Sequence, residues 1–214
     1  MVIRAYSIGI FPMAGHRHDP HVHWVAPNAR GILPLQSFHV PRRLAKTVRR
    51  RRFEVVCNRD FYDVLAGCAA PRPGHPETWI NPEIARVFTR LHELGHAHSI
   101  EAWRGPRLVG GLYGLVLGAA FFGESMFSRE RDASKIVLVH LVALLRRGGF
   151  ALFDTQFVTD HLRQFGAVEI PSQVYLQQLD DALSQPATFY CGLSADDLWA
   201  DAVALATQST TITS

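Results

Sequence analysis

Apolar and polar residues follow no steady period in the first part of this chain, whereas a regular period appears after residue 78. Residues 1–40 are rich in Gly, Pro and His, which predicts a small, loop-rich unit with short strands. A basic helix over residues 41–52, a strand over residues 53–58 and a helix ending at Pro71 are expected next. The first third of the chain therefore predicts short elements joined by loops.

From residue 78 the apolar spacing alternates between helical and extended periods. A helix over residues 81–95 has Pro82 in its first turn and Gly95 at its expected end. Residues 107–127 predict a hairpin that turns near Gly118. The other expected elements are a strand over 98–104, a long apolar helix over 132–149, a strand over 150–158, a short helix over 159–166, a strand over 167–171 and a helix over 172–183. Residues 204–214 are expected to fray.

This order of elements indicates an α+β fold. It also resembles the acetyltransferase-like (GNAT) layout, in which a cleft opens between splayed central strands. We expect a small N-terminal α/β domain with the basic segment over residues 1–50. A GNAT-like catalytic domain over residues 51–190 and a C-terminal tail over residues 191–214 are expected to follow.

Composition limits the class of protein further. The chain has 214 residues, of which 48% are hydrophobic and 19% charged, as in an ordinary globular protein. This length suits one large domain, or a main domain with a small appendage. Its three cysteines form no C-x-x-C motif, which favours a reducing compartment without a zinc knuckle. No apolar run approaches the roughly 20 residues of a membrane helix, so we interpret the protein as cytoplasmic.

The modest net charge of +3 hides a strongly basic segment. Helical spacing places several of its side chains on one face, which is typical of a surface that binds the phosphates of a nucleic acid. The alternative is a helix face that is merely solvated. The residues predicted to bind nucleic acid are Arg42, Arg43, Lys46, Arg49, Arg50, Arg51 and Arg52.

Polar residues interrupt two of the apolar strands. Glu124 lies within the hairpin, and Asp154 and Gln156 lie two residues apart on the strand over residues 150–158. Side chains two apart share a face of a strand, so a carboxylate and an amide are expected to line a cleft together. The alternative for Asp154 alone is a hydrogen-bonded network in the core. Two such interruptions on neighbouring strands favour a functional site.

Three histidines near residue 95 resemble a metal-binding motif. His92, His96 and His98 are closely spaced, but Gly95 ends the helix between them, and no H-E-x-x-H pattern lies on one helix. We therefore expect packing roles for these side chains and no metal site.

Several long motifs resemble one family, the leucyl/phenylalanyl-tRNA–protein transferases. The most specific are "LHELGHAHS" and "FFGESMFSR", supported by "AYSIGIFPM" near the start and "GAVEIP" over residues 166–171. A W-x-x-P-x-x-R pattern at Trp24, Pro27 and Arg30 and the D-x-Q pattern at Asp154 and Gln156 also match. The resemblance covers most of residues 5–183.

The resemblance implies a bacterial enzyme that moves Leu or Phe from aminoacyl-tRNA to a protein whose N-terminal residue is Arg or Lys. The product would be marked for degradation by the N-end rule pathway. The implied fold is a small N-terminal domain followed by a GNAT-like catalytic domain. The implied partners are the charged tRNA and the acceptor protein or peptide, and no metal, CoA or other cofactor is expected.

The resemblance also implies roles for individual residues. Gln156 is expected to accept a hydrogen bond from the acceptor amine, while Asp154 polarises the glutamine amide. The alternative is that Gln156 only orients the amine and that Asp154 or solvent takes the proton. Glu124 is expected to hold the donor near the tRNA 3′ end or at its ammonium group, in place of a protein partner. The expected donor pocket consists of Met126, Phe121, Leu112, Leu138 and Phe153, and Trp79 and Trp24 are expected to stack on or flank the terminal adenosine. The alternative for each of these residues is ordinary core packing, which taken singly is the commoner role of such apolar side chains.

Two other functions fit parts of the sequence. An acyl-CoA N-acyltransferase would need a glycine-bearing phosphate loop, but Asp132 stands where that loop requires glycine, and its charge would repel pyrophosphate. A non-catalytic tRNA- or RNA-binding module would explain the basic segment but not the polar residues in the strands. Both remain alternatives to the transferase.

Overall fold

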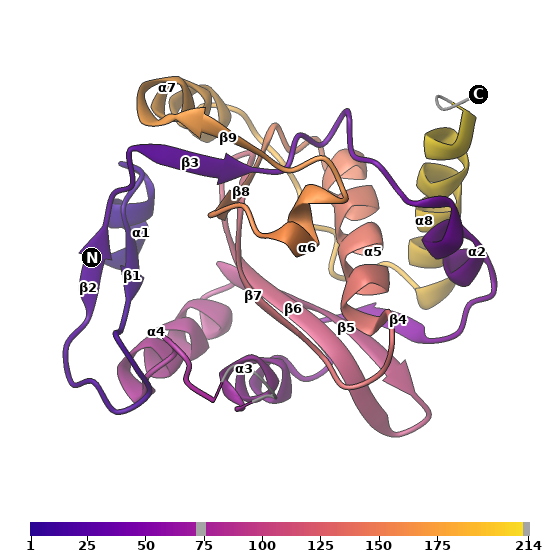
Figure 1. The fold of residues 1–214 in the computed structure, drawn as a ribbon, viewed down its shortest axis with the longest axis horizontal. Helices are drawn as coiled ribbons and strands as arrows, with labels where there is room; N and C mark the ends of the chain where they lie inside the picture. The colour runs from indigo at the N-terminus through magenta and orange to yellow at the C-terminus, as the bar shows by residue number, and fades with distance from the viewer. Residues whose placement is uncertain (72–75, 212–214) are drawn as a thin grey trace.

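A seven-stranded sheet organises the computed structural model, which describes residues 1–71 and 76–211 (Figure 1). Its strands, in spatial order, are β4 (Glu54–Cys57), β5 (Ala97–Arg104), β6 (Arg107–Leu117), β7 (Ala120–Ser128), β8 (Leu152–Gln156), β3 (Ala29–Ile32) and β9 (Val168–Pro171). The β7–β8 pair is parallel and the other neighbouring pairs are antiparallel. Together with its helices, this mixed sheet confirms the α+β prediction.

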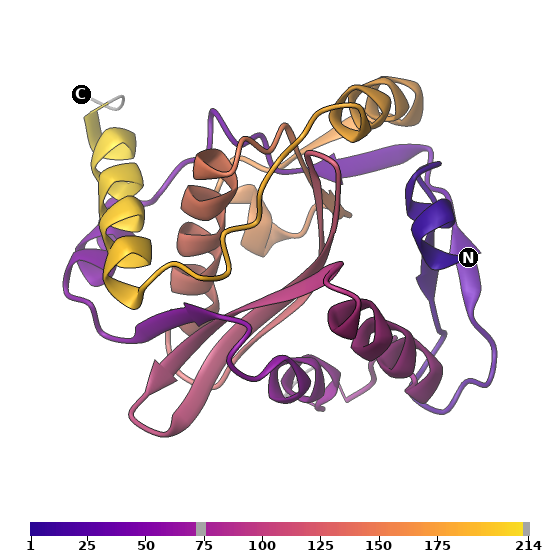
Figure 2. The same cartoon turned by 180° about the vertical axis from the view of Figure 1, so that it is seen from behind.

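Helices cover both faces of the sheet (Figures 1 and 2). On one face lies α5 (Ala133–Arg147), an almost wholly buried helix that packs with α2 (Arg42–Arg49) and α8 (Ala195–Thr211) in one core. On the other face, α3 (Phe61–Ala69) and α4 (Pro82–Glu93) share a second core with α7 (Ser172–Leu183). The short α6 (Asp160–Arg163) follows β8.

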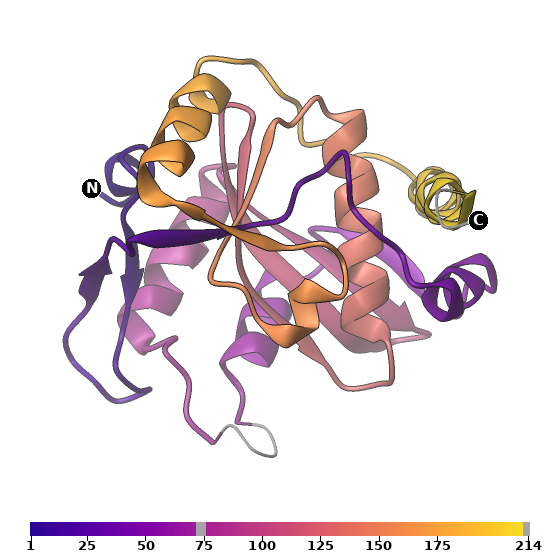
Figure 3. The ribbon, with the colours of Figure 1, turned by 45° about the horizontal axis from the view of Figure 1, so that its top comes forward.

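The N-terminal residues form a unit beside this sheet. The short helix α1 (Val2–Tyr6) precedes β1 (Phe11–Met13) and β2 (His23–Val25), which pair as a separate two-stranded sheet. The chain then enters the large sheet as β3, between β8 and β9 (Figure 3). The expected loop-rich start is confirmed, and the division into residues 1–50, 51–190 and 191–214 stays a prediction.

Local signals placed most element ends correctly. The Asn81 side chain caps α4 by accepting a hydrogen bond from the Ile84 N–H, and Pro82 occupies the first turn. Gly95 follows the helix with a φ of +79°, and Gly118 turns the β6–β7 hairpin with a φ of +52°. Both angles lie in the left-handed region that favours glycine.

The prediction that residues 204–214 fray is wrong as far as Ala206. Leu198, Ala202, Leu205 and Ala206 form the buried stripe of α8, at a spacing that puts them on one helix face. The stripe begins before the polar end of the chain, so the composition of the last residues concealed it. The core cluster that includes α5 and α2 buries these residues.

The parallel pair β7–β8 is short. Ala120–Phe122 pair with Leu152–Asp154, after which β7 continues to Ser128 beside β6 alone. Beyond Asp154 the two strands separate, and this separation is where a cavity forms. None of the helices in residues 1–71 and 76–211 is long and apolar enough to cross a membrane.

Candidate active site

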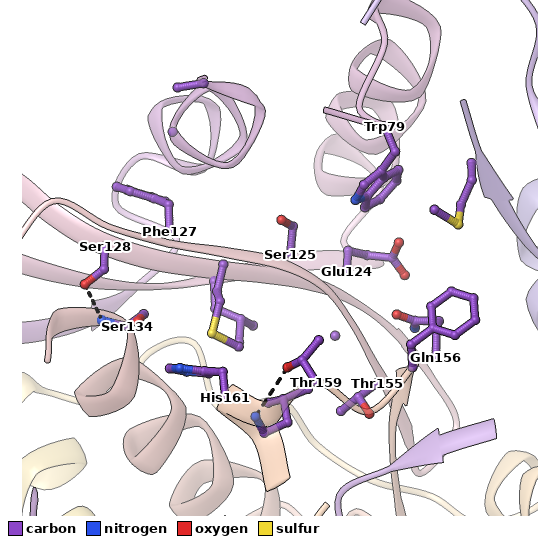
Figure 4. Close-up of a pocket in the computed structure, with 18 of the residues that line it drawn as sticks. Trp79, Glu124, Ser125, Phe127, Ser128, Ser134, Thr155, Gln156, Thr159 and His161 are labelled. Atoms are coloured by element: carbon purple, nitrogen blue, oxygen red, sulfur yellow. Dashed lines mark hydrogen bonds between the residues drawn. The ribbon is translucent and has the colours of Figure 1, made fainter. Parts of the chain in front are cut away.

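A cavity of about 610 Å³ opens where β7 and β8 separate (Figure 4). Its volume is typical of a site for a small ligand. Residues of β1, α3, β6, β7 and β8 line it, together with the first turn of α5 and the segment around α6. Most of the lining is apolar, and the polar members include Glu124, Ser125, Arg129, Thr155, Gln156 and Thr159.

Four of the seven predicted pocket residues line this cavity: Met126, Leu112, Phe153 and Trp79. The other three lie elsewhere. Phe121 and Leu138 are fully buried in the core that includes α5, where the Phe121 ring lies 5.4 Å from the Phe153 ring. Trp24 lies on β2, opposite Pro12 of β1, and is 43% exposed.

Glu124 of β7 faces the cavity and is half-buried. The Tyr6 hydroxyl donates a hydrogen bond of 2.8 Å to its Oε1, so the carboxyl group has a protein partner, contrary to the expectation. Burial raises the pKa of Glu124 to about 8, and the charge of Asp154 adds to this effect. The Tyr6 hydrogen bond and the Arg30 charge oppose it. At neutral pH the carboxyl group is therefore largely protonated.

Asp154 lies behind the cavity wall in a fully buried network. Its oxygens accept hydrogen bonds from Arg30 Nε at 2.9 and 3.1 Å and from Arg30 Nη2 at 2.6 Å. The Tyr175 hydroxyl donates at 2.6 Å and the backbone N–H of Gln156 at 2.8 Å. This is the hydrogen-bonded core network that the sequence left as the alternative for Asp154. All its lone pairs are directed at protein donors.

Arg30 is the cation that makes this burial possible. Only 1% of its surface is exposed, and its Nη1 donates to the Gly9 carbonyl oxygen at 2.9 Å. The guanidinium carbon lies 4.5 Å from the centres of both the Phe11 and the Tyr175 rings. Arg30 thus joins the N-terminal unit, β8 and α7 around one carboxylate.

Gln156 departs from the regular strand geometry. Its φ of +56° is left-handed, so strand alternation ends there, and Gln156 lines the cavity while Asp154 points into the network. The expectation that the two side chains share a face fails for this reason. Gly31 is opposite Gln156 in β3, where a Cβ atom would lie 2.6 Å from the carbonyl carbon of Phe157.

The Gln156 amide is held by backbone carbonyl groups. Its nitrogen donates to the Gly123 oxygen at 2.9 Å and the Thr155 oxygen at 3.3 Å, because the reverse orientation would place the amide oxygen against these acceptors. Carbonyl groups, and not the Asp154 carboxylate, therefore polarise this amide. Asp154 holds the backbone of Gln156 instead.

Sequence reasoning missed three residues of this arrangement: Tyr6, Arg30 and Tyr175. Arg30 was part of a recognised motif, but a lone arginine gives no signal that it is buried. Tyr6 and Tyr175 contact carboxylates 118 and 21 residues away along the chain, respectively. Such pairings depend on the fold and have no local signature.

The histidines near Gly95 make packing and hydrogen-bond contacts. The His92 ring stacks on Phe61 at 4.1 Å, and its Nδ1 lies 2.8 Å from the Ala97 oxygen. The His98 Nδ1 lies 2.9 Å from the Asn58 amide nitrogen. In the described part of the chain, no three His, Cys, Asp or Glu side chains are arranged to hold a metal ion.

The seven basic residues predicted to bind nucleic acid are all exposed, four of them on α2 and three directly after it. Two already contact neighbouring groups. Arg51 forms an ion pair with Asp196, and Arg52 lies 3.6 Å from Glu130. The apolar face of α2, formed by Leu44, Ala45 and Val48, is buried against the core, which leaves its basic face open to solvent.

Comparison with known proteins gives a consistent result. The model of the leucyl/phenylalanyl-tRNA protein transferase family matches residues 32–180, and that of the family's N-terminal domain matches residues 1–28. A leucyl/phenylalanyl-tRNA–protein transferase of Rhodopseudomonas palustris (strain HaA2) is 58% identical over 189 residues, which cover 88% of this chain and 84% of that protein. The protein of the same name from Phenylobacterium zucineum is also 58% identical, over 88% of this chain and 86% of its own.

Proposed function

The chain belongs to the leucyl/phenylalanyl-tRNA protein transferase family, and we propose that it transfers Leu or Phe from aminoacyl-tRNA to an acceptor protein. The acceptor begins with Arg or Lys, and the added residue marks it for degradation. The observation that carries this proposal is the apolar cavity at the separation of β7 and β8, with Glu124 and Gln156 on its wall. The same separation supports a GNAT-like arrangement of the catalytic domain.

The cavity suits the donor side chain. Met126, Leu112 and Phe153 give an apolar lining, and the flexible methionine adapts to an aliphatic or an aromatic guest. Trp79 lies on the same wall as Glu124 and offers a ring on which the terminal adenosine can stack (Figure 4). Phe121 and Leu138 would act only by supporting this lining from the core.

The reaction is the aminolysis of an ester. The acceptor α-amine nitrogen attacks the ester carbonyl carbon, a C–N bond forms, and the C–O bond to the tRNA ribose breaks. The amine loses one proton, and the departing ribose oxygen gains one, so no further reactant is required. The main task of the protein is to hold the amine and the ester together, which alone lowers the barrier by several kcal/mol, up to about 7–11 in the best cases.

Gln156 and Glu124 have separate roles in this step. The Gln156 amide, fixed by the Gly123 and Thr155 carbonyl groups, presents its oxygen to the acceptor amine and orients it. Glu124 meets the ammonium group of the donor amino acid, and loses its proton when that cation binds. Asp154 acts through the backbone of Gln156 and has no contact with substrate in this proposal.

Acyl-CoA is a poor donor for this site. Asp132, with a left-handed φ of +67°, is the residue that precedes α5, where an acetyltransferase would bind pyrophosphate. Its carboxylate would repel that group. Aminoacyl-tRNA is therefore the donor, and the seven basic residues on and directly after α2 form part of its binding surface.

The test is a transfer assay with purified protein, a panel of charged tRNAs and peptides that differ only in their first residue. We expect product from Leu-tRNA and Phe-tRNA with peptides that begin with Arg or Lys. Binding of tRNA without any product would favour the RNA-binding module. Product from acetyl-CoA would favour the N-acyltransferase.

A further inference from the structure

Three arginines surround one carboxylate beside the cavity. Glu130 lies 2.7 Å from Arg104, 3.4 Å from Arg107 and 3.6 Å from Arg52. The three arginine side chains are 42%, 70% and 41% exposed, whereas that of Glu130 is 19% exposed. One negative charge cannot neutralise three positive ones, so this arginine cluster carries a surplus of two positive charges.

Further contacts hold Arg52, Arg104 and Glu130 in place within the arginine cluster. The guanidinium groups of Arg52 and Arg104 both lie 5.3 Å from the centre of the Phe53 ring. The backbone N–H of Glu130 donates to the Val109 carbonyl oxygen, and the backbone carbonyl oxygen of Glu130 accepts from the Ser128 hydroxyl at 2.7 Å. Like charges held together in this way repel one another unless an anion lies between them.

The arginine cluster also connects two surfaces that the function requires. Ser128 and Arg129 line the cavity, and Glu130 is the next residue, with its Cα about 3.8 Å further along the chain. Arg52 is the last of the seven basic residues that lie on and directly after α2. A polyanion that runs from the cavity to α2 therefore passes the arginine cluster.

We propose that Arg52, Arg104 and Arg107 bind phosphates of the donor tRNA near its aminoacylated end, and that Glu130 occupies their centre when the tRNA is absent. This inference rests on the proposed function. An RNA backbone is the ligand that fits, because the ester reacts in the cavity, and the nucleotides next to it must leave the cavity past this surface. Bound phosphates would compete with Glu130 for the guanidinium groups.

The experiment compares two donors. Phe-tRNA carries the phosphates, whereas phenylalanyl-adenosine has the same ester without them. In the Arg104→Ala/Arg107→Ala variant we expect the KM for Phe-tRNA to rise roughly tenfold at low salt. The slope of log KM against the logarithm of the salt concentration should be smaller by roughly 1.5. Transfer from phenylalanyl-adenosine should be unchanged. Glu130→Gln should act in the opposite direction and lower the KM for Phe-tRNA roughly two- to fivefold.

The matched control is Arg86→Ala/Arg90→Ala, which removes two exposed, ion-paired arginines from α4. It should leave both donors unaffected. An unaltered salt dependence in the Arg104→Ala/Arg107→Ala variant, or an equal loss with both donors, would overturn the inference. A wild-type protein that uses neither donor would instead overturn the proposed function, so the two failures are distinguishable.

Discussion

The two carboxyl groups at the β7–β8 separation lie in opposite environments. Asp154 is fully buried behind the cavity wall and accepts hydrogen bonds from Arg30, Tyr175 and the Gln156 backbone. Glu124 faces the cavity and accepts from the Tyr6 hydroxyl. The same type of side chain thus forms part of a buried network in one region and lines the cavity in the other.

Electrostatics explains why the two differ. Burial acts to lower the pKa of Arg30, but the hydrogen bonds and charge of Asp154 outweigh it and raise that pKa, so the guanidinium group stays charged. Glu124 has no buried arginine in contact, and burial raises its pKa to about 8. A charged anchor is rigid, whereas a carboxyl group that titrates near neutral pH responds to the charge of its ligand.

Removal of the anchoring cation should have the largest effect. In Arg30→Ala the buried Asp154 carboxylate loses its partner, and we expect the free energy of unfolding to fall by about 3–5 kcal/mol. Urea unfolding measures this difference. Arg86→Ala, which removes an exposed ion-paired arginine, is the matched control and should change stability little. A loss below about 1 kcal/mol for Arg30→Ala would show that the network does not anchor the wall.

The second prediction concerns the pH dependence of stability. Folded Glu124 keeps its proton up to about pH 8, whereas the unfolded chain loses it near the ordinary glutamate value. Between these two pKa values the folded state binds more protons than the unfolded chain. Its free energy of unfolding therefore falls as pH rises from about 5 to 8, by up to about 1.4 kcal/mol per pH unit.

Glu124→Gln should remove this contribution. Urea unfolding at several pH values should show that the variant loses less stability than the wild type between pH 5 and 8. Identical slopes for the two proteins would mean that Glu124 is ionised in the folded state. The comparison of the two carboxyl groups would then fail.

The smallest expected effect is a proton released on binding. A cationic donor analogue that meets Glu124 should lower its pKa, so up to one proton leaves the protein at pH 7. Calorimetry of phenylalanyl-adenosine binding in buffers with different ionisation enthalpies counts that proton. In Glu124→Gln the count should drop toward zero, and an unchanged count would assign the proton to another group.

How much of this arrangement the sequence predicts depends on how local the cause is. The elements from Pro82 to Leu183 follow from apolar spacing and from Gly and Pro signals, and they were predicted well. Glu124 and Gln156 were found because polar residues are conspicuous in apolar strands. The apolar spacing of an element and a polar residue inside an apolar strand can both be recognised within a few residues of sequence.

The remaining features depend on distant contacts. The Arg30–Asp154 pair joins residues 124 positions apart, and the left-handed Gln156 depends on Gly31 in a neighbouring strand. Period-two alternation placed Asp154 and Gln156 on one face, and the turn at Gln156 separated them. The sequence therefore identified the polar residues but not which of them faces the cavity.

The most direct test of the account is the single-turnover rate of Phe transfer in the Gln156→Gly variant. Glycine adopts a φ of +56° without strain, so the wall should keep its shape while the amide is lost. We predict a rate about 100-fold below the wild type with unchanged affinity for Phe-tRNA, and a wild-type rate in Gln164→Ala, which removes an exposed amide. A Gln156→Gly variant that transfers Phe at the wild-type rate would contradict the claim that this side chain receives the acceptor amine.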